Sequence, residues 1–202
     1  IYAAHHDHLV FRWSPQAGLR VWRHDSPEAT SFRPDGKGGY YVVEQTTRQV
    51  TRWNEQGERI EILADRFKGK RLNRPNDLRL HPDGSLWFTD PDFLFRLRPD
   101  DVKELGGQYI FRLDPESLEI RAVVEDADNP NGIAISAGGD SLFFTDSMSK
   151  NIYRAAIHED GNVGEREIFA TSQLGGLDGL TFDSEGRLWN AAKTDVKVYQ
   201  AD

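Results

Sequence analysis

The sequence predicts an all-β protein, and more specifically a β-propeller, from three observations. Almost no window carries apolar residues at the i, i+3, i+4 and i+7 positions that an amphipathic helix requires. Short apolar and aromatic runs instead alternate with clusters of Gly, Pro, Asp and Asn, which is typical of short strands joined by turns. The third observation is an internal repeat of about 50 residues, which is the length of a propeller blade.

The apolar runs predict short strands along the whole chain. These are Leu9–Trp13, Leu19–Trp22, Tyr40–Glu44, Val50–Trp53, Leu78–Leu80, Leu86–Thr89, Gln108–Leu113, Ile133–Ile135, Leu142–Thr145, Asn151–Arg154, Leu180–Phe182, Leu188–Ala191 and Val196–Tyr199. Turn residues such as Asp83-Gly84 and Gly138-Gly139 separate neighbouring strands and favour tight hairpins. Short strands of this kind build sandwiches, barrels or propellers, so the repeat has to decide among them.

The repeat is clearest where Pro-Asn-Asp-Leu before a strand and Leu-Trp-Phe-Thr-Asp in the next strand (75–90) return as Pro-Asn-Gly-Ile and Leu-Phe-Phe-Thr-Asp (130–146). The four copies begin at Glu28, Asn76, Asn131 and Asp178, which are spaced 48, 55 and 47 residues apart. We therefore expect one propeller domain over residues 1–202, with a partial blade at 1–22 and about four to five blades in all. Neither end of the chain falls at a blade boundary, so we expect a truncated propeller.

Composition excludes several classes of function. Lys and Arg number 25 against 33 Asp and Glu, and the net charge of −8 disfavours binding to nucleic acid. The chain has no cysteine, so it contains no disulfide, no thiolate metal site and no cysteine nucleophile. No apolar stretch approaches the roughly 18 to 20 residues of a membrane span. We expect a soluble protein without a membrane partner, and a cytoplasmic or a periplasmic location both stay open.

The first residue of each repeat lies at the start of the innermost strand of a blade, and these strands line the channel of a propeller. We therefore expect Glu28, Asn76, Asn131 and Asp178 to converge on one axis. Their side-chain oxygens are the ligands that a hard cation such as Ca²⁺ prefers. A simpler interpretation is that Asn and Asp before a strand cap the turn between blades. The recurrence of Asn76, Asn131 and Asp178 in register favours the cation site.

A second set of acidic residues recurs at the end of the second strand of a repeat. These are Glu44, Asp90 and Asp146. Their side chains either face the channel or cap the turn that follows.

The linked motifs resemble those of the gluconolactonase and regucalcin (senescence marker protein) family. They are Asn-Arg-Pro-Asn-Asp (73–77), Asp-Gly-Ser-Leu-Trp-Phe-Thr-Asp-Pro (83–91), Pro-Asn-Gly (130–132) and Leu-Asp-Gly-Leu (177–180). The preceding stretch Leu-Ala-Asp-Arg-Phe-Lys-Gly-Lys-Arg-Leu (63–72) strengthens the likeness to gluconolactonases. The resemblance spans essentially the whole chain.

The resemblance implies a six-bladed propeller that holds one divalent cation, most often Ca²⁺, with Zn²⁺ or Mg²⁺ as alternatives, and hydrolyses a small lactone. It implies that Asn131 and Asp178 bind the cation, with Asn76 as a third ligand or a water-bridged neighbour, and that Arg74 and Asn76 contact the substrate. The related diisopropylfluorophosphatase uses a similarly placed Asn on calcium. The sequence departs from the family in lacking the Glu-Gly-Pro motif whose Glu is a further ligand. At a repeat near 50, we expect roughly 70 to 100 residues of a complete six-bladed domain to be absent from this sequence.

The expected chemistry agrees with the residue types. A cation polarises the lactone carbonyl group, while a carboxylate, for which Asp178 is the candidate, takes a proton from the attacking water. Arg74 carries a planar, permanently charged group that suits hydrogen bonding to a polyhydroxylated ring. The alternatives are a related phosphotriesterase or aryl-esterase and a non-catalytic propeller that binds a ligand or a protein, because propellers host many functions.

Overall fold

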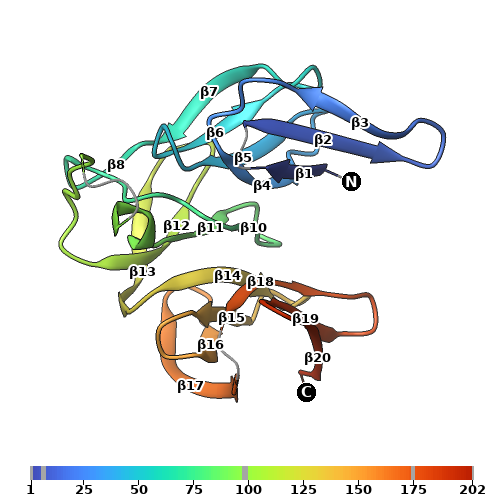
Figure 1. Ribbon diagram of the computed structural model, residues 1–202. Coiled ribbons are helices and arrows are strands. Elements are labelled where there is room, and N and C mark those ends of the chain that lie inside the picture. The colour runs from blue at the N-terminus through green and yellow to red at the C-terminus, as the bar shows by residue number, and fades with distance from the viewer. Residues whose placement is uncertain (1, 6–7, 97–99, 174–175, 202) are drawn as a thin grey trace.

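The computed structural model describes residues 2–5, 8–96, 100–173 and 176–201 of this protein. These residues form five antiparallel sheets that follow one another in chain order, from the blue sheet near the N-terminus to the red sheet near the C-terminus (Figure 1). In the described residues three of these sheets have four strands and two have three. The prediction of an all-β propeller with about four to five blades is confirmed.

Within each sheet the strands pair in the order of the chain. The first sheet contains β1 (Tyr2–His5), β2 (Leu9–Ser14) and β3 (Gly18–Arg23), and the second contains β4 (Ala29–Pro34), β5 (Tyr40–Glu44), β6 (Gln49–Trp53) and β7 (Arg59–Ala64). The third contains β10 (Leu78–Leu80), β11 (Leu86–Asp90), β12 (Gln108–Leu113) and β13 (Ile120–Ala127). The fourth contains β14 (Pro130–Ile135), β15 (Ser141–Asp146), β16 (Asn151–Ile157) and β17 (Val163–Thr171), and the fifth contains β18 (Leu177–Phe182), β19 (Arg187–Ala192) and β20 (Val196–Gln200). A small ribbon of β8 (Arg66–Phe67) and β9 (Lys70–Arg71) lies between the second and third sheets in the chain.

The first strands of the second to fifth sheets lie side by side in space. β4 contacts β10, β10 contacts β14, and β14 contacts β18. They are the inner strands that the repeat predicts, and each begins just after or within the segment that carries Glu28, Asn76, Asn131 or Asp178. The segments at the starts of these four inner strands therefore lie next to one another.

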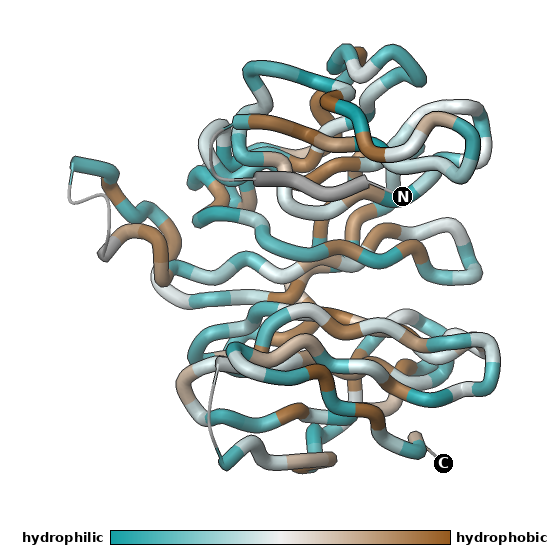
Figure 2. Tube along the Cα trace, turned by 45° about the vertical axis from the view of Figure 1, so that its right-hand side comes forward, coloured by the Kyte–Doolittle hydropathy of each residue, from teal (hydrophilic) through white to brown (hydrophobic). Residues whose placement is uncertain are grey.

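Apolar side chains fill the spaces between neighbouring sheets, because consecutive residues of a strand point to opposite faces. In β11, Phe88 belongs to the apolar cluster that includes Val43 of the second sheet, whereas Trp87 belongs to the cluster that includes Ile133 of the fourth sheet. All four of these side chains are fully buried, and burying one such side chain stabilises the fold by about 1.5–3 kcal/mol. Figure 2 shows hydrophobic colour along the strands and hydrophilic colour at the hairpin turns.

Every strand predicted from the sequence is present, but several strands were missed, and the outer strands of the complete sheets are the clearest case. β7, β13 and β17 each contain two exposed charged residues and lack a long run of buried apolar residues. An outer strand pairs on one side only, and charged side chains are common there.

The described residues include a single helical segment, the one-turn 3₁₀ helix η1 (Phe93–Arg96), and they contain no helix that is long and apolar enough to cross a membrane.

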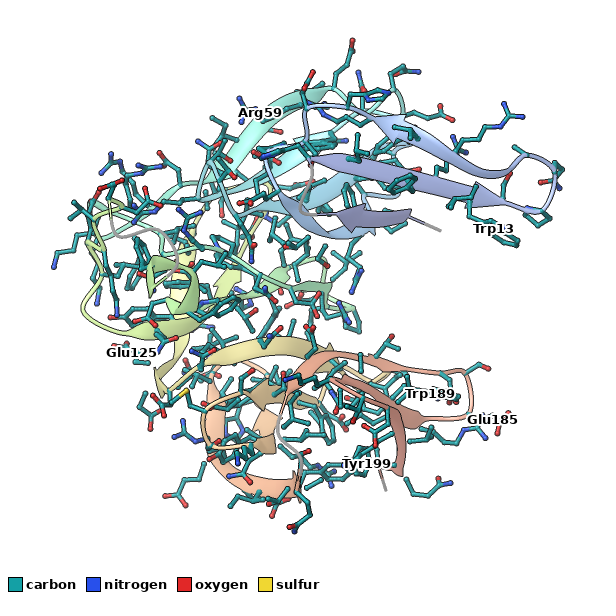
Figure 3. All side chains as sticks on the ribbon, in the orientation of Figure 1. Trp13, Arg59, Glu125, Glu185, Trp189 and Tyr199 are labelled. Atoms are coloured by element: carbon teal, nitrogen blue, oxygen red, sulfur yellow. The ribbon has the colours of Figure 1, made fainter. Side chains whose placement is uncertain are left out.

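Exposed apolar side chains gather on the first and fifth sheets. Figure 3 shows Trp13 on the first sheet and Trp189 on the fifth, on the same side of the molecule as the chain ends. Trp13 is 42% exposed and Trp189 is 37% exposed, and their cross-strand partners Leu19 and Val198 are exposed as well. In the described part of the chain each of these two sheets packs against one other sheet, so one face of each meets solvent.

Candidate functional site

The main chain at three of the predicted site residues is fixed by threonine hydroxyl groups of the preceding sheet. Thr30 Oγ1 donates to the carbonyl oxygen of Asn76 (2.5 Å). In the same way Thr89 Oγ1 donates to Asn131 O (2.6 Å) and Thr145 Oγ1 donates to Asp178 O (2.9 Å). Each hydrogen bond crosses from one sheet to the next, so the segments that carry Asn76, Asn131 and Asp178 hold definite positions relative to one another.

The segments of Asn131 and Asp178 are in direct contact. A Cβ atom added to Gly132 would lie 2.3 Å from Asp178 O and 2.7 Å from the Cα atom of Gly179. No side chain fits in this space, which explains why a glycine follows Asn131. The backbone approach brings β14 and β18 together at the predicted cation site.

The side chains at this edge differ in their environment. Asn131 Oδ1 is buried and accepts no hydrogen bond from any described residue. Asp178 is exposed and Asn76 is partly exposed. A buried carbonyl oxygen without a donor is unfavourable in a folded protein unless another group, such as water or a cation, meets it. The donor set of one carboxylate and amide oxygens therefore fits a hard cation such as Ca²⁺.

The described residues contain no cluster of acidic and histidine side chains that would form a different metal site. Within the described ranges no three His, Asp or Glu side chains gather as metal ligands. Glu28, the first residue of its repeat, is buried and accepts a hydrogen bond from Thr46 Oγ1 (2.7 Å) in its own sheet. The amides of Asn76 and Asn131 thus distinguish the predicted site from a site of acidic residues alone.

Arg74 lies two residues before Asn76, but its side chain is only 2% exposed. Its guanidinium group forms an ion pair with Asp101 and donates to the carbonyl oxygen of Gln45 (2.9 Å). The ring of Phe95 lies 5.6 Å from the guanidinium carbon. Direct contact between the Arg74 guanidinium group and a substrate therefore requires the ion pair with Asp101 to break.

Asp77 directly follows Asn76 in the chain, and its hydrogen bonds connect the inner strands. Its carboxylate accepts hydrogen bonds from Ser31 Oγ in β4 (2.7 Å) and from Ile133 N in β14 (3.2 Å). Arg79 donates to Asp77 (2.8 Å) and also to the carbonyl oxygen of Leu180 in β18. Burial raises the pKa of Asp77, although the charge of Arg33 and these hydrogen bonds oppose the shift. One carboxylate and one guanidinium group thereby connect all four inner strands.

Two of the recurrent acidic residues at the ends of the second strands, Glu44 and Asp146, are buried and fully hydrogen-bonded. Asp146 accepts hydrogen bonds from the backbone N–H groups of Asp128 (2.9 Å), Asn129 (3.1 Å), Met148 (3.2 Å) and Ser149 (3.1 Å). Glu44 accepts from the side chains of Thr47 (2.5 Å), Thr51 (2.7 Å), Trp53 (2.8 Å) and Arg59 (3.2 Å). Of the two interpretations that the sequence left open, capping describes Asp146, whereas Glu44 mainly links the side chains of neighbouring strands in its own sheet.

Asp90 occupies the same place in the third sheet but is bonded less completely. Its Oδ2 atom accepts a hydrogen bond from Asn73 N (2.8 Å), and Asp90 Oδ1 is buried without a hydrogen-bond partner among the described residues. Burial raises the pKa of Asp90 to about 7, although hydrogen bonds from the backbone of Asn73 and Arg74 act against the rise.

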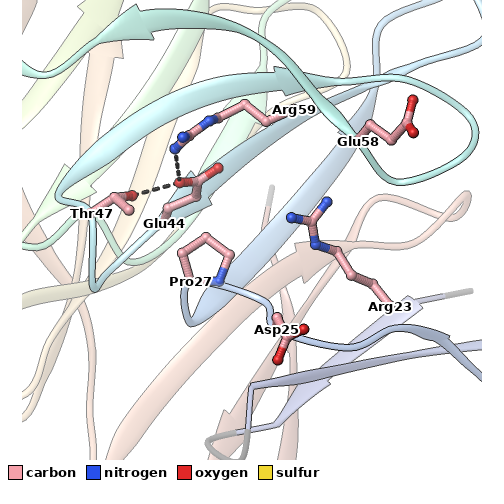
Figure 4. A pocket seen from close by; sticks show the side chains of 7 residues that line it. All are labelled: Arg23, Asp25, Pro27, Glu44, Thr47, Glu58 and Arg59. Atoms are coloured by element: carbon pink, nitrogen blue, oxygen red, sulfur yellow. Dashed lines mark hydrogen bonds and ion pairs between the residues drawn. The ribbon is translucent and has the colours of Figure 1, made fainter.

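A pocket of about 390 Å³ lies between the first and second sheets (Figure 4). Figure 4 shows the Glu44 carboxylate bonded to Thr47 and Arg59 at one end of the pocket. The remaining lining residues are Arg23, Asp25, Pro27 and Glu58. None of Arg74, Asn76, Asn131 and Asp178 lines this pocket, so it is separate from the predicted site.

Sequence reasoning missed three groups that shape the site. Thr89 and Thr145 recur in the Phe-Thr-Asp motif, and that recurrence is a signal that could have revealed their role. Asp77 stands where the next two repeats have Gly132 and Gly179, which is also visible in the sequence. Asp101 follows no repeated pattern, so its pairing with Arg74 is seen in the structure alone.

The chain matches the family described as SMP-30/Gluconolactonase/LRE-like region over residues 6–202. The gluconolactonase of Zymomonas mobilis is 27% identical over 96% of this chain and 61% of its own length. The pentonolactonase XacC of Haloferax volcanii is 34% identical over 90% of this chain and 58% of its own length. The chain thus spans about three fifths of the length of these curated relatives.

Solved structures share the fold. The structure described as XC5397 from Xanthomonas campestris, a gluconolactonase, superposes with a TM-score of 0.88 at 30% identity, over 97% of this chain and 66% of that chain. Regucalcin from Agrobacterium tumefaciens, described as a calcium-binding protein, superposes with a TM-score of 0.76 at 22% identity, over 96% of this chain and 64% of that chain. At that identity the regucalcin likeness concerns the fold alone.

Proposed function

We propose that this chain, which belongs to the SMP-30/gluconolactonase/LRE-like family, is the larger part of a hydrolase that opens sugar lactones with the help of a divalent cation. The lactonase names of two relatives support the reaction class, and their substrates are sugar-derived lactones. The calcium-binding description of regucalcin, which has the same fold, supports Ca²⁺ as the cation to test first.

One observation carries the proposal. Asn131 Oδ1 is buried without a donor among the described residues, and its segment is in contact with the segment of the exposed carboxylate Asp178. Buried oxygen atoms in proteins rarely lack a partner. We therefore infer that a bound group interacts with Asn131 Oδ1. A hard cation is that group, and Asn76 is the third ligand or a water-bridged neighbour.

The residues of the chain have distinct roles in the proposed reaction. When bound, the cation polarises the lactone carbonyl group and stabilises the negative charge that develops on its oxygen. Asn131 and Asp178 hold the cation, and the Asp178 carboxylate also accepts a proton from the attacking water. Asn76 hydrogen-bonds a substrate hydroxyl group through its partly exposed amide. Arg74 joins it once Asp101 releases the guanidinium group.

The test is to measure acid release from a panel of 1,5- and 1,4-lactones of hexoses and pentoses, corrected for spontaneous hydrolysis. We expect turnover that stops with a chelator and returns with Ca²⁺. Asn131→Ala and Asp178→Asn should abolish both turnover and Ca²⁺ binding measured by calorimetry. Asp195→Asn is the matched control, because Asp195 is another exposed aspartate of the fifth sheet region, and it should leave both unchanged.

Two outcomes would redirect the proposal. Lactone turnover that persists with a chelator would show that the reaction needs no cation, while the assignment as a lactonase would stand. Absence of turnover on every lactone, with retained Ca²⁺ binding, favours either a phosphotriesterase or aryl-esterase, which ester substrates would reveal, or a non-catalytic binding propeller.

A further inference from the structure

Asp90 is a buried carboxyl group that supports the segment carrying Arg74 and Asn76. We propose that Asp90 is a positioning residue for this segment and that its protonation makes substrate binding depend on pH. The inference rests on the proposed function, because it takes Arg74 and Asn76 to bind the substrate. It adds that the charge of Asp90 affects how well this segment binds the substrate.

The hydrogen bonds of Asp90 connect three parts of the third sheet. Its Oδ2 atom accepts from the backbone N–H of Asn73 (2.8 Å), and the backbone N–H of Arg74 also bonds to the carboxyl group. The Asn73 side chain in turn donates to Asp90 O (3.1 Å) and to Gly107 O (3.0 Å). The Asn73–Asn76 segment, the end of β11 and the start of β12 are therefore held by one cluster.

The fourth sheet contains the same arrangement with one difference. Asp146 receives two backbone N–H groups on Oδ2 and two on Oδ1, so both oxygens are satisfied. After Asp90 the chain takes another path, and the N–H of Asp92 donates to Gln108 Oε1 (3.0 Å) instead. Asp90 Oδ1 is left buried, with no donor among the described residues, as is Asn73 Oδ1.

The charged groups around Asp90 are engaged with other partners. Arg48 donates to Leu72 O (2.6 Å) and Val102 O (3.1 Å), Lys103 pairs with Asp92 (2.5 Å), and Arg74 pairs with Asp101. Of these cations, Arg48 and Lys103 lower the pKa of Asp90 through their charge alone, without a hydrogen bond to it. Burial dominates and raises that pKa to about 7, so the carboxyl group changes its charge near neutral pH.

Ionisation places a buried negative charge next to the Asn73–Asn76 segment, met by two backbone N–H groups but by no bonded counter-ion among the described residues. A buried charge without a counter-ion attracts water or a nearby cation, and the cations whose charge acts on Asp90 are Arg48 and Lys103. Arg48 is bonded to Leu72 O (2.6 Å), directly before the Asn73–Asn76 segment. Displacement of Arg48 toward Asp90 would therefore move the substrate-binding segment. The neutral form of Asp90 therefore favours the arrangement that binds the substrate, and the ionised form weakens it.

The experiment measures KM for a turned-over lactone from pH 6 to pH 8, with correction for spontaneous hydrolysis. We expect KM of the wild type to rise about fivefold over this range, the lower end of typical coupling between two sites. Asp90→Asn is a neutral isostere of the protonated carboxyl group, and it should keep a low KM that no longer depends on pH. The matched control Asp146→Asn, which removes a satisfied cap, should lower stability but keep the pH dependence of KM.

A second measurement separates this inference from the proposed function. In a ¹³C NMR titration of the wild-type aspartate carboxyl groups, one resonance should titrate near pH 7 and be absent from Asp90→Asn, whether or not any lactone is hydrolysed. A flat wild-type KM profile, an unchanged profile in Asp90→Asn, or no aspartate titrating between pH 6 and pH 8 would each overturn the inference. Absence of lactone turnover with the expected titration would instead refute the proposed function.

Discussion

The hydroxyl group of Thr89 in the third sheet donates a 2.6 Å hydrogen bond to the carbonyl oxygen of Asn131 in the fourth sheet. The same oxygen atom of Thr89 accepts a hydrogen bond from Asp77 N (3.1 Å) in its own sheet. Thr145 repeats this relationship one sheet later, because it accepts from Gly132 N (2.7 Å) and donates to Asp178 O (2.9 Å). Each threonine thus links its own inner strand to the next one, at the height of the predicted cation site.

We predict that Thr89→Val and Thr145→Val destabilise the fold by about 1–3 kcal/mol each, because each leaves a buried donor and acceptor unpaired. Thr145→Val should also weaken Ca²⁺ binding, since it frees the segment of Asp178. Urea unfolding and calorimetry measure the two effects. Thr181→Val, at an exposed position of β18, is the control and should change neither. Equal stability of all three variants would show that these hydrogen bonds contribute nothing net.

Asp77→Asn should destabilise the protein by about 3 kcal/mol, because it leaves Arg33 and Arg79 without their carboxylate partner in the protein interior. The loss should appear in the urea midpoint together with weaker Ca²⁺ binding, since Asp77 connects the strands that follow Asn76, Asn131 and Asp178. Asp128→Asn, at an exposed aspartate, controls for the loss of one negative charge. Unchanged stability of Asp77→Asn would mean that the hydrogen bonds of an amide replace those of the carboxylate.

Asp101→Asn should lower KM for the lactone several-fold, because the Asp101 carboxylate occupies the guanidinium group of Arg74 that the substrate needs. Arg74→Lys should raise KM, since lysine lacks the planar fork of arginine. Steady-state kinetics at saturating Ca²⁺ measures both variants, and Asp100→Asn at the exposed neighbouring position is the control. If Asp101→Asn raised KM as Arg74→Lys does, Asp101 would orient Arg74 for the substrate rather than compete with it.

Acid should weaken the fold through Asp83. Burial by itself would raise the pKa of Asp83, but hydrogen bonds from Ser85, Arg112 and His81 outweigh it and hold the pKa well below the usual value. A lowered pKa in the folded state adds stability above the unfolded-state value of about 4 and loses it as the pH falls further. Asp83→Asn should therefore be less stable than the wild type at pH 7, and the difference should shrink below about pH 4. Chemical unfolding at both pH values measures this, and a difference that stays constant would contradict it.

Most of the inner and middle strands could be predicted because their apolar runs are buried on both faces and their turns contain Gly, Pro, Asp and Asn, although the inner strand β4 was missed. The paired aromatic residues Trp87 and Phe88 illustrate why, since each fills the space to a different neighbouring sheet. The outer strand β7 escaped prediction because most of its residues are exposed. Its Ile60 and Ile62 alternate with charged residues but are themselves exposed, so this pattern marks no buried face.

The repeat in the sequence by itself determined the propeller and the order in which Asn76, Asn131 and Asp178 stand at the starts of inner strands. Only the tertiary structure decided how each repeated position is used. Asp90 and Asp146 are the same residue in the same motif, yet Asp146 meets four backbone donors, whereas Asp90 keeps a buried oxygen that no described residue meets with a donor. Likewise Arg74 lies in the substrate motif but is buried against Asp101. The physical reason is that hydrogen bonding and burial depend on neighbours distant in the chain, which a local motif does not specify.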